Sequence, residues 1–378
     1  MADNKYVKKV TTFKSGPFYF TAFQDPNMIG KCIEVRLLYN SVADLPILPQ
    51  FASRLEEEAI IKSIFGTAAL EGNPLTEEKV AELLSTTNGQ QKRKRAEREI
   101  LNLKEAYKFI SSFKPIDKPF ILEEAVIKKL HSIITSGVDY KDNVPGSYRN
   151  EAVKVGDSEH GGVYTPPKVL DDIRNLMKEF CDWMNSPEIS EFPAEIRGCL
   201  AHYHLAIIHP FGNGNGRTAR ALEALVMQAS GIKYMPVMLS NYYYRNIDDY
   251  YWAFSNTLNH AQHEITPMLD FALNGMKESL AIIKSKIAYA IRMLTLGVFY
   301  GELRNKKEVT QRQHDLLMLL LDKPITFTLP DLAKSDIFKV LYRRVSERTA
   351  RRDLKKLEGI LLLLAENGSY TLNLRLLG

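Results

Sequence analysis

Residues 209–220 bring together, within a short stretch, the side chains that phosphate chemistry needs. His209 lies next to a turn and can act as general base for an attacking hydroxyl. Three glycines alternate with two asparagines after it, and both residue types readily adopt left-handed backbone angles. When such a turn opens a helix, its N–H groups and the helix dipole favour an anion. Arg217 and Arg220 are three positions apart, so they can grip neighbouring phosphates from one helix face.

Two other interpretations of this segment are weaker. His209 alone would more often be structural, but the combination of base, glycines and arginines favours a nucleotide site. The Gly-Lys-Ser/Thr that ends a P-loop is missing from this run. His202 and His204 are close by, but they point to different faces of one expected helix and no adjacent Glu or Cys completes a metal site.

The run His209-Pro-Phe-Gly-Asn-Gly-Asn-Gly-Arg-Thr-Ala-Arg220 resembles the signature of Fic-domain proteins. The similarity continues upstream in Gly146-Ser-Tyr-Arg149, Tyr164-Thr-Pro-Pro167 and Ala201-His202, and downstream in Tyr250-Tyr251. It covers roughly residues 120–275. The resemblance implies an α-helical domain that uses ATP and Mg²⁺ and transfers AMP to a serine, threonine or tyrosine hydroxyl of a target protein.

The same resemblance implies a role for each residue of the motif. His209 would take the proton of the hydroxyl, and Phe211 would anchor the loop from below. Arg217 would stabilise the diphosphate leaving group, and Arg220 would reach the γ-phosphate. The α- and β-phosphates would be held by Gly214, Asn215 and Gly216.

Further contacts are implied on either side of the motif. A hairpin near residues 153–156, including Val155 and Gly156, would pair with the backbone of the target as an added strand. Tyr250 and Tyr251 would lie near the adenine, although core packing on a helix explains two tyrosines equally well.

Asn213 departs from the family pattern, which usually has Asp or Glu at this position to bind the magnesium that bridges the phosphates. An amide oxygen can still ligate Mg²⁺, but the attraction of a carboxylate's charge is lost. Because magnesium neutralises developing charge in phosphoryl chemistry, we expect a lower rate or a higher magnesium requirement. Asn213 is therefore a nucleotide contact and a weak candidate metal ligand.

Glu71 closes the segment Thr67-Ala-Ala-Leu-Glu71-Gly72, which resembles the inhibitory motif of Fic proteins. A carboxylate placed against Arg220 would occupy the site that the γ-phosphate needs, and a bidentate pair would hold it there. ATP would then bind only in a non-productive pose. We therefore expect a resting state that is switched off by Glu71.

The pattern along the chain predicts a mainly α protein with four parts. Residues 1–115 form an N-terminal region, an irregular lead-in with a small sheet element followed by the inhibitory helix at 53–72, where apolar residues recur every three or four positions. Residues 116–277 are mostly helical with a β-hairpin flap suggested by the alternating stretch 152–155, and the resemblance implies that they form the Fic-type helical domain. Residues 278–307 supply a connecting helix and a polar linker at 301–307.

Residues 308–378 resemble a winged helix-turn-helix, with a helix capped by Ser346 followed by two strands of a wing. The candidate recognition helix carries basic residues at Arg348, Arg351, Arg352, Lys355 and Lys356. Such a helix could bind DNA, but Glu347, Asp353 and Glu358 dilute its charge, and winged helices also serve as protein-interaction modules. Both interpretations stay open.

Composition and charge limit the compartment and the kinds of partner that we expect. No run is long enough to span a membrane and no apolar N-terminal signal is present, so we expect a cytoplasmic protein without membrane contact. Three unpaired cysteines argue against a disulfide framework. The net charge of +5 is too small to imply nucleic-acid binding by itself, and the run Lys92-Arg-Lys-Arg95 is best explained as a solvated helix start.

The leading hypothesis is an autoinhibited protein adenylyltransferase with His209 as base and Glu71 as inhibitor. The alternative is a catalytically weak Fic scaffold that regulates transcription by binding DNA through its winged helix. Removal of AMP, which would use the same Glu71, also stays open. So do the target protein, the preferred nucleotide, and whether the chain is a monomer or a homodimer.

Overall fold

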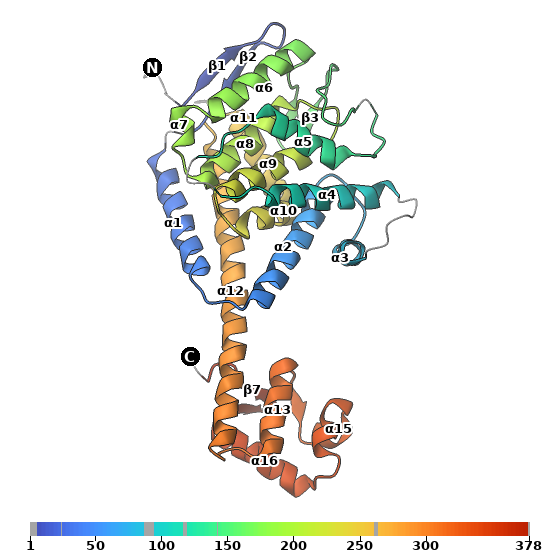
Figure 1. Ribbon diagram of the computed structural model, residues 1–378, viewed down its shortest axis with the longest axis vertical. Helices are drawn as coiled ribbons and strands as arrows, with labels where there is room; N and C mark the ends of the chain where they lie inside the picture. The colour runs from blue at the N-terminus through green and yellow to red at the C-terminus, as the bar shows by residue number, and fades with distance from the viewer. Residues whose placement is uncertain are drawn as a thin grey trace. The chain divides into compact units, whose positions relative to one another are not determined.

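The computed structural model describes residues 6–23, 25–86, 94–115, 119–141, 143–260 and 264–376. This described part is mainly helical, as the sequence predicts, with three small antiparallel sheets (Figure 1). Contacts divide the chain into a first unit, Met1–Ile283, and a second unit, Lys284–Gly378. The division falls inside a helix and not at the predicted boundary between residues 307 and 308. No helix of the described residues combines the length and apolar character that crossing a membrane requires.

The first unit is built, in chain order, from β1 (Lys8–Thr11), β2 (Pro17–Phe20), α1 (Pro26–Ala43), α2 (Pro49–Ala69), α3 (Glu77–Ser85), α4 (Arg95–Ser111), α5 (Glu124–Thr135), β3 (Val155–Asp157), β4 (Gly162–Tyr164), α6 (Leu170–Met184), α7 (Pro187–Ser190), α8 (Ala194–Ile208), α9 (Asn215–Ala229), α10 (Met235–Arg245) and α11 (Ile247–Leu258). α12 (Thr266–Asn305) begins in this unit and ends in the second.

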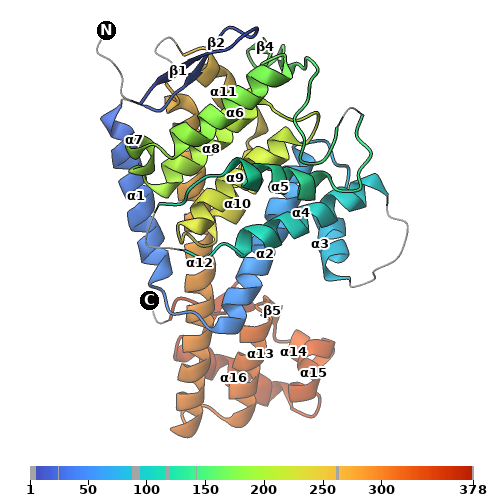
Figure 2. The ribbon, with the colours of Figure 1, turned by 45° about the horizontal axis from the view of Figure 1, so that its top comes forward.

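α8 and α9 form the centre of the first unit and run side by side (Figures 1 and 2). α8 is buried at nearly every position because apolar residues occur all around it. α9 contacts α2, α4, α5 and α10 as well as α8. The segment between α8 and α9 is the glycine-rich run of the motif, so the site lies where the most buried helices of the unit meet.

The N-terminal segment contains a helix that the sequence pattern did not reveal. β1 and β2 pair as the expected small sheet, but α1 follows in place of an irregular lead-in. Its start has a local signal, because the side chain of Asp25 accepts from the N–H of Asn27 and Pro26 occupies the first helical turn. Exposed apolar residues such as Ile33 and Leu37 obscure its amphipathic pattern.

The inhibitory helix was predicted at 53–72, but α2 runs from Pro49 to Ala69. Gly72 adopts a left-handed conformation with φ +78°, and the N–H of Asn73 bonds the carbonyl of Ala68. These features close the helix three residues early, in the way that a glycine after a helix commonly does. Glu71 therefore lies in a turn that follows the helix.

Two other boundaries differ from expectation. The prediction of a polar linker at 301–307 is wrong at its start. α12 continues to Asn305, and Tyr300 and Leu303 are buried. The flap hairpin is present and consists of β3 and β4. Because β3 begins at Val155, most of the alternating stretch 152–155 lies before the hairpin. Lys92 and Arg93 of the basic run lie outside the described residues, whereas Arg95 begins α4.

The second unit has its own apolar core and a three-stranded sheet of order β5–β7–β6. Its further elements are α13 (Gln311–Asp322), β5 (Phe327–Thr328), α14 (Asp331–Lys334), α15 (Asp336–Tyr342), α16 (Glu347–Gly359), β6 (Leu363–Glu366) and β7 (Ser369–Leu372). Ser346 caps α16 as expected, and α15 is a helix that the sequence pattern did not separate from its surroundings. The assignment as a winged helix-turn-helix stays a prediction.

Candidate functional site

The loop between α8 and α9 has a backbone that few sequences could adopt. His209 ends α8 in the left-handed region with φ 52° and ψ 56°, and Gly214 precedes α9 with φ 76°. Asn215 closes the loop with two hydrogen bonds to Phe211, accepting from its N–H at 2.9 Å and donating to its carbonyl at 2.8 Å. The alternation of glycine and asparagine thus serves loop closure as well as the expected anion contact.

Phe211 lies under this loop, fully buried, and stacks on His131 of α5 with ring centroids 3.7 Å apart. The Nδ1 atom of His131 accepts from the N–H of Gly146, so its Nε2–H donates to the carbonyl of Asn213. Burial lowers the pKa of His131 to about 4, and the nearby Arg217 also lowers it. A neutral imidazole therefore holds the loop from below.

His209 is arranged as a base with one free nitrogen. Its Nδ1 lies 3.1 Å from the carbonyl oxygen of Ala206, which can only accept, so Nδ1 carries the proton. Nε2 is left with its lone pair. Burial lowers the pKa of His209 to about 4; Arg149 lowers it further, while the bond to Ala206 and the charge of Glu71 oppose this. The imidazole is neutral at physiological pH and can take a proton.

Arg149 joins the histidine to the hairpin. It is buried, and its Nε donates to the carbonyl of His209 at 2.7 Å. Its other guanidinium nitrogens donate to the carbonyls of Glu151 and Pro167, which flank the hairpin on its two sides. One side chain therefore fixes both the backbone of the base and the roots of the flap.

Glu71 contacts Arg220 as predicted, although through one oxygen where a bidentate pair was expected. Its Oε1 lies 2.7 Å from Nη2 of Arg220, while Oε2 lies 3.9 Å from Nε of Arg217. Thr67 also accepts from Nε of Arg220 at 2.8 Å. Burial disfavours the charged form of Glu71, but the Arg220 and Arg217 guanidiniums hold its pKa below the usual value. The inhibitory candidate is thus a carboxylate.

Gly216 explains how the carboxylate comes so close to the start of α9. A β-carbon at this position would lie 2.3 Å from Oε1 of Glu71 and 3.1 Å from Nη1 of Arg220. The carboxylate therefore occupies space at the N-terminal end of a helix, where an anion is favoured. A side chain at position 216 would exclude Glu71 and would also crowd any phosphate that replaced it.

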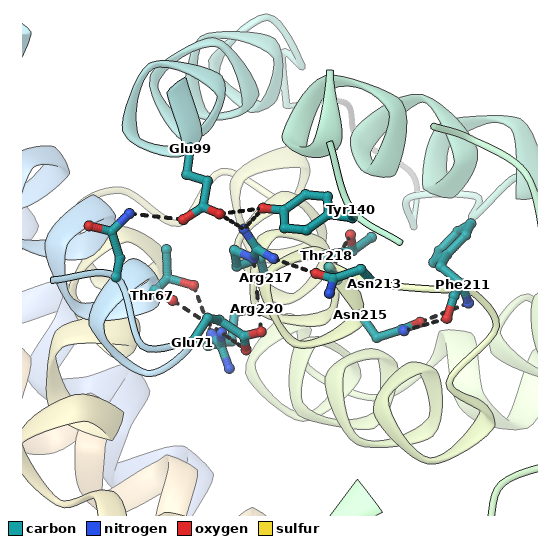
Figure 3. A network of polar contacts seen from close by, with 12 residues as sticks. Thr67, Glu71, Glu99, Tyr140, Phe211, Asn213, Asn215, Arg217, Thr218 and Arg220 are labelled. Atoms are coloured by element: carbon teal, nitrogen blue, oxygen red, sulfur yellow. Dashed lines mark hydrogen bonds and ion pairs between the residues drawn. The ribbon is translucent and has the colours of Figure 1, made fainter. Parts of the chain in front are cut away.

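Arg217 lies in a buried polar network with Tyr140, Glu99 and Asn213 (Figure 3). Its Nη1 donates to the hydroxyl of Tyr140 at 2.6 Å, and its Nη2 donates to Oδ1 of Asn213 at 2.8 Å. The hydroxyl of Tyr140 in turn donates to Glu99 at 2.7 Å. Tyr140 and Glu99 were not singled out from the sequence.

The Asn213 side chain does not fit a resident magnesium ion in this arrangement. Its amide oxygen already accepts a hydrogen bond from a guanidinium, whose positive charge would repel a divalent cation. Among the described residues, no group of three His, Cys, Asp or Glu side chains could hold a metal ion. We therefore derive no step of the chemistry through a metal.

A cavity of about 720 Å³ collects nearly all residues of the predicted site. Its wall includes Glu71, Val155, Gly156, His209, Asn213, Gly214, Asn215, Gly216, Arg220, Tyr250 and Tyr251. Arg217 is the exception, because its guanidinium points towards Tyr140 and Glu99 (Figure 3). The hairpin β3–β4 forms one wall of this cavity and the loop between α8 and α9 forms another.

The two tyrosines of α11 differ. Tyr250 is a core residue that stacks on Tyr243, and its hydroxyl contacts Nε2 of His202 at 2.9 Å and Nη1 of Arg220 at 3.3 Å. Tyr251 is partly exposed. The core explanation therefore holds for Tyr250, which nevertheless borders the cavity. His202 also faces a glutamate, since its Nδ1 lies 3.0 Å from Glu223.

Residues 121–227 match the Fic/DOC family. The chain contains a Fic domain. Two curated relatives are similar to it, each named protein adenylyltransferase Fic. The one from Nematostella vectensis is 30% identical over 71% of this chain and 58% of its own length. The one from Aedes aegypti is 30% identical over 52% of this chain and 37% of its own length.

A solved structure supports the fold over a longer stretch than the Fic domain. A Fic family protein from Desulfovibrio desulfuricans G20 covers 93% of this chain and 97% of its own, with a TM-score of 0.58 and 18% identity. The curated relatives are longer proteins, of which this chain spans between about a third and three fifths.

The residues that hold the Fic loop in place, and that the sequence did not reveal, lie outside the motif. His131 and Arg149 belong to the Fic domain, whereas Glu99 precedes the matched region on α4. Gly146-Ser-Tyr-Arg149 was noticed as a resemblance without a role for its arginine. His131 and Glu99 have no motif of their own, and only the packing of α4 and α5 against α9 brings them to the Fic loop.

Proposed function

We propose that this chain is an autoinhibited transferase that moves AMP from ATP onto a hydroxyl side chain of a target protein and of itself. The observation that carries the proposal is that the imidazole of His209 is neutral and has a free Nε2. This imidazole lines the same cavity as the N-terminal residues of α9. The names of the curated relatives support the choice of AMP transfer among the reactions that such a site could perform.

In the proposed step, the hydroxyl oxygen of the target attacks the α-phosphorus of ATP. The bond from that phosphorus to the oxygen bridging to the β-phosphate breaks, and diphosphate leaves. The hydroxyl proton passes to Nε2 of His209. N–H groups of Gly214, Asn215 and Gly216 would hold the phosphates at the helix start, and Arg217 and Arg220 would neutralise their charge.

The target is expected to bind along the hairpin. β3 and β4 pair with each other through only three residues each, and Val163 is 54% exposed. An extended segment of a target could add a strand to the free edge of this hairpin and present its hydroxyl to His209. Arg149 would keep the hairpin and the base in a constant relation during this step.

Glu71 would keep the enzyme off, because its carboxylate engages Arg220 where the γ-phosphate is expected. Glu71→Gly should therefore raise self-labelling by ATP that carries the label on its α-phosphate. ATP labelled on the γ-phosphate should give no signal, because that phosphate leaves. Mass spectrometry of the product should show one adenylyl group and its acceptor residue.

Controls separate the parts of this proposal. Glu57→Gln removes an exposed carboxylate from α2 and should label like wild type. His209→Ala in the Glu71→Gly protein should abolish labelling. Equal labelling of wild type and Glu71→Gly would overturn the inhibitory role, and no labelling of either would overturn the transferase. Release of AMP from the labelled protein by wild type, and not by Glu71→Gly, would show removal of AMP by the same site.

DNA binding by the second unit is a second candidate, favoured by one observation. The sequence predicted that Asp353 offsets part of the positive charge of α16. Asp353 is buried, however, and its carboxylate pairs with Arg312 at 2.8 Å. The solvent face of α16 therefore keeps Arg348, Arg352 and Lys355 exposed, while Arg351 pairs with Glu347. The exposed face is more basic than the sequence of the helix suggests.

A duplex-binding assay over a range of salt concentrations tests this candidate. Simultaneous Arg348→Ala, Arg352→Ala and Lys355→Ala should weaken binding and flatten its salt dependence, since each phosphate contact contributes to that slope. Lys323→Ala, which removes an exposed charge outside α16, is the matched control. Binding that does not respond to the triple substitution would exclude α16 as the DNA-binding surface.

A further inference from the structure

We propose that Glu99 on α4 is a positioning residue that holds two parts of the site at once: Arg217, and the turn that carries Glu71. The inference rests on the proposed function, and it concerns a residue that neither the motif nor the Fic-matched region contains. The contacts of this one buried carboxylate carry it (Figure 3).

Glu99 is only 8% exposed, yet its two oxygens are fully engaged. Oε1 accepts from the hydroxyl of Tyr140 at 2.7 Å and from Nε of Arg95 at 3.1 Å, and it lies 3.8 Å from Nη1 of Arg217. Oε2 accepts from Nδ2 of Asn73 at 2.9 Å. Burial disfavours ionisation, but these partners hold the pKa of Glu99 below its usual value, so the group is a carboxylate.

The first branch leads to Arg217 through Tyr140. A phenol has one proton, and Tyr140 donates it to Glu99, so its oxygen is left to accept from Nη1 of Arg217. Asn213 accepts from Nη2. Nε of Arg217 is buried without a hydrogen-bond partner among the described residues, and Oε2 of Glu71 lies 3.9 Å from it. Glu99 and Tyr140 thereby leave one N–H of Arg217 directed to the side where Glu71 now sits.

The second branch leads to the inhibitory turn through Asn73. Nδ2 of Asn73 donates both to Glu99 and to the carbonyl of Ala96, so the side chain is fastened to α4 at two points. The N–H of Asn73 donates to the carbonyl of Ala68 and closes the turn. Glu71 is two residues away within that turn. Its carboxylate is therefore kept against Arg220 by a bond to α4 as well as by its own ion pair.

The two branches should affect ATP binding in opposite directions. Cutting the Asn73 branch loosens Glu71 and gives the γ-phosphate access to Arg220. Cutting the Tyr140 branch leaves Glu71 in place but releases Nη1 of Arg217, so the Nε–H of that side chain is no longer held on the side where Glu71 sits and the phosphates are expected. A general loss of stability would instead weaken ATP binding in both cases, so the opposite signs distinguish positioning from folding.

The experiment measures the dissociation constant for ATP by calorimetry, together with KM and kcat for self-labelling. Asn73→Ala in the otherwise unchanged chain should bind ATP several-fold more tightly than wild type and should gain labelling. Tyr140→Phe in the Glu71→Gly protein should bind ATP about tenfold more weakly than Glu71→Gly alone, because a bond to a charged group is lost. Its KM should rise more than its kcat falls.

Glu99→Gln keeps the shape of the side chain but removes the charge that both branches share. In the Glu71→Gly protein, where only the Tyr140 branch still acts on the site, it should decrease ATP affinity. Tyr300→Phe removes another buried hydroxyl, one without a hydrogen-bond partner among the described residues, and should not change this affinity.

Two results would overturn the inference: Asn73→Ala that binds ATP no better than wild type, or Tyr140→Phe and Glu99→Gln that leave the ATP affinity of Glu71→Gly unchanged. ATP affinity does not require transfer. If Glu71→Gly binds ATP but labels nothing, the proposed function fails, while the order of affinities still decides the role of Glu99.

Discussion

Two walls of the cavity are built in contrasting ways. The loop wall, residues 209–215, is tied by hydrogen bonds to Arg149 and His131 and closed by a buried bond between Phe211 and Asn215, and it contains left-handed backbone at two positions. The flap wall, β3 and β4, consists of two three-residue strands in which no residue is fully buried. Strained backbone persists only where its surroundings overdetermine it, so the loop wall suits a ligand of fixed shape such as a triphosphate.

The flap wall suits a ligand that arrives as a flexible chain. Its strands are held together by their own ladder and by local contacts, such as the N–H groups of Glu159 and His160 on Asp157. Arg149 fixes the roots of the hairpin, but few buried contacts hold its strands beyond the roots, so the strands can shift without disturbing the core. Under the proposed function, one wall is therefore prepared for the nucleotide before binding, whereas the other adapts to the target.

The largest effect should come from breaking the loop wall. Phe211→Ala removes a fully buried ring and its stack on His131, which should lower the free energy of unfolding by about 3–5 kcal/mol. Val163→Ala trims the exposed face of the flap and should change it by less than about 0.5 kcal/mol. Urea unfolding of both variants measures the contrast. Similar losses would show that the two walls are equally integrated into the fold.

A second test uses one histidine from each wall. Burial lowers the pKa of His209 to about 4, whereas the hydrogen bond to Asp157, against some desolvation, raises the pKa of His160 in the flap. The base must be neutral, so the kcat of Glu71→Gly should stay level from about pH 8 to pH 5 and fall about tenfold per unit once the pH is below about 4. The charge of Glu71 raises the pKa of His209, so its removal should not shift the acid limb of the kcat profile to higher pH.

Any pH dependence above the ordinary histidine pKa of about 6.5 should instead belong to the flap. In the flap, His160 loses its proton as the pH rises through its raised pKa. The loss of this charge weakens the contacts of His160 with Asp157 and Asp248. The effect should appear in the KM for a target peptide and vanish in His160→Asn. Circular dichroism at each pH checks that the protein stays folded. An acid limb of kcat near neutral pH would show that His209 is not the base in this state.

The loop wall could be predicted from the sequence because its determinants are contiguous. His209, Phe211, Gly214 and Asn215 lie within seven positions, and each residue type has a local reason to be there. The turn after α2 was found for the same reason, although Gly72 ends the helix earlier than proline alone would suggest. Local conformational preference and local spacing thus identify a site before its fold is known.

The residues that support this wall could not be predicted in the same way. His131, Tyr140 and Glu99 come from separate segments, and each is unremarkable within its own helix or loop. Their roles depend on how α4 and α5 pack against α9, which is a property of the tertiary fold. The charge of α16 was misjudged for a related reason, because the burial of Asp353 follows from its pairing with Arg312 across two helices.

The smallest effect should come from sharpening the loop wall at Asn213. Its amide oxygen accepts from Arg217, so Asn213→Asp can keep that bond while adding a negative charge at the edge of the cavity. A carboxylate attracts a divalent cation where the amide does not, so the magnesium concentration for half-maximal labelling by Glu71→Gly should fall by a few-fold. A titration with Mg²⁺ at fixed ATP measures it, with Asn143→Asp as a control because Asn143 bonds the N–H of Asn213 from outside the loop. If the requirement is unchanged, the charge at position 213 is neutralised by Arg217 alone, and the wall is built for a phosphate that binds to guanidinium groups and not to a metal.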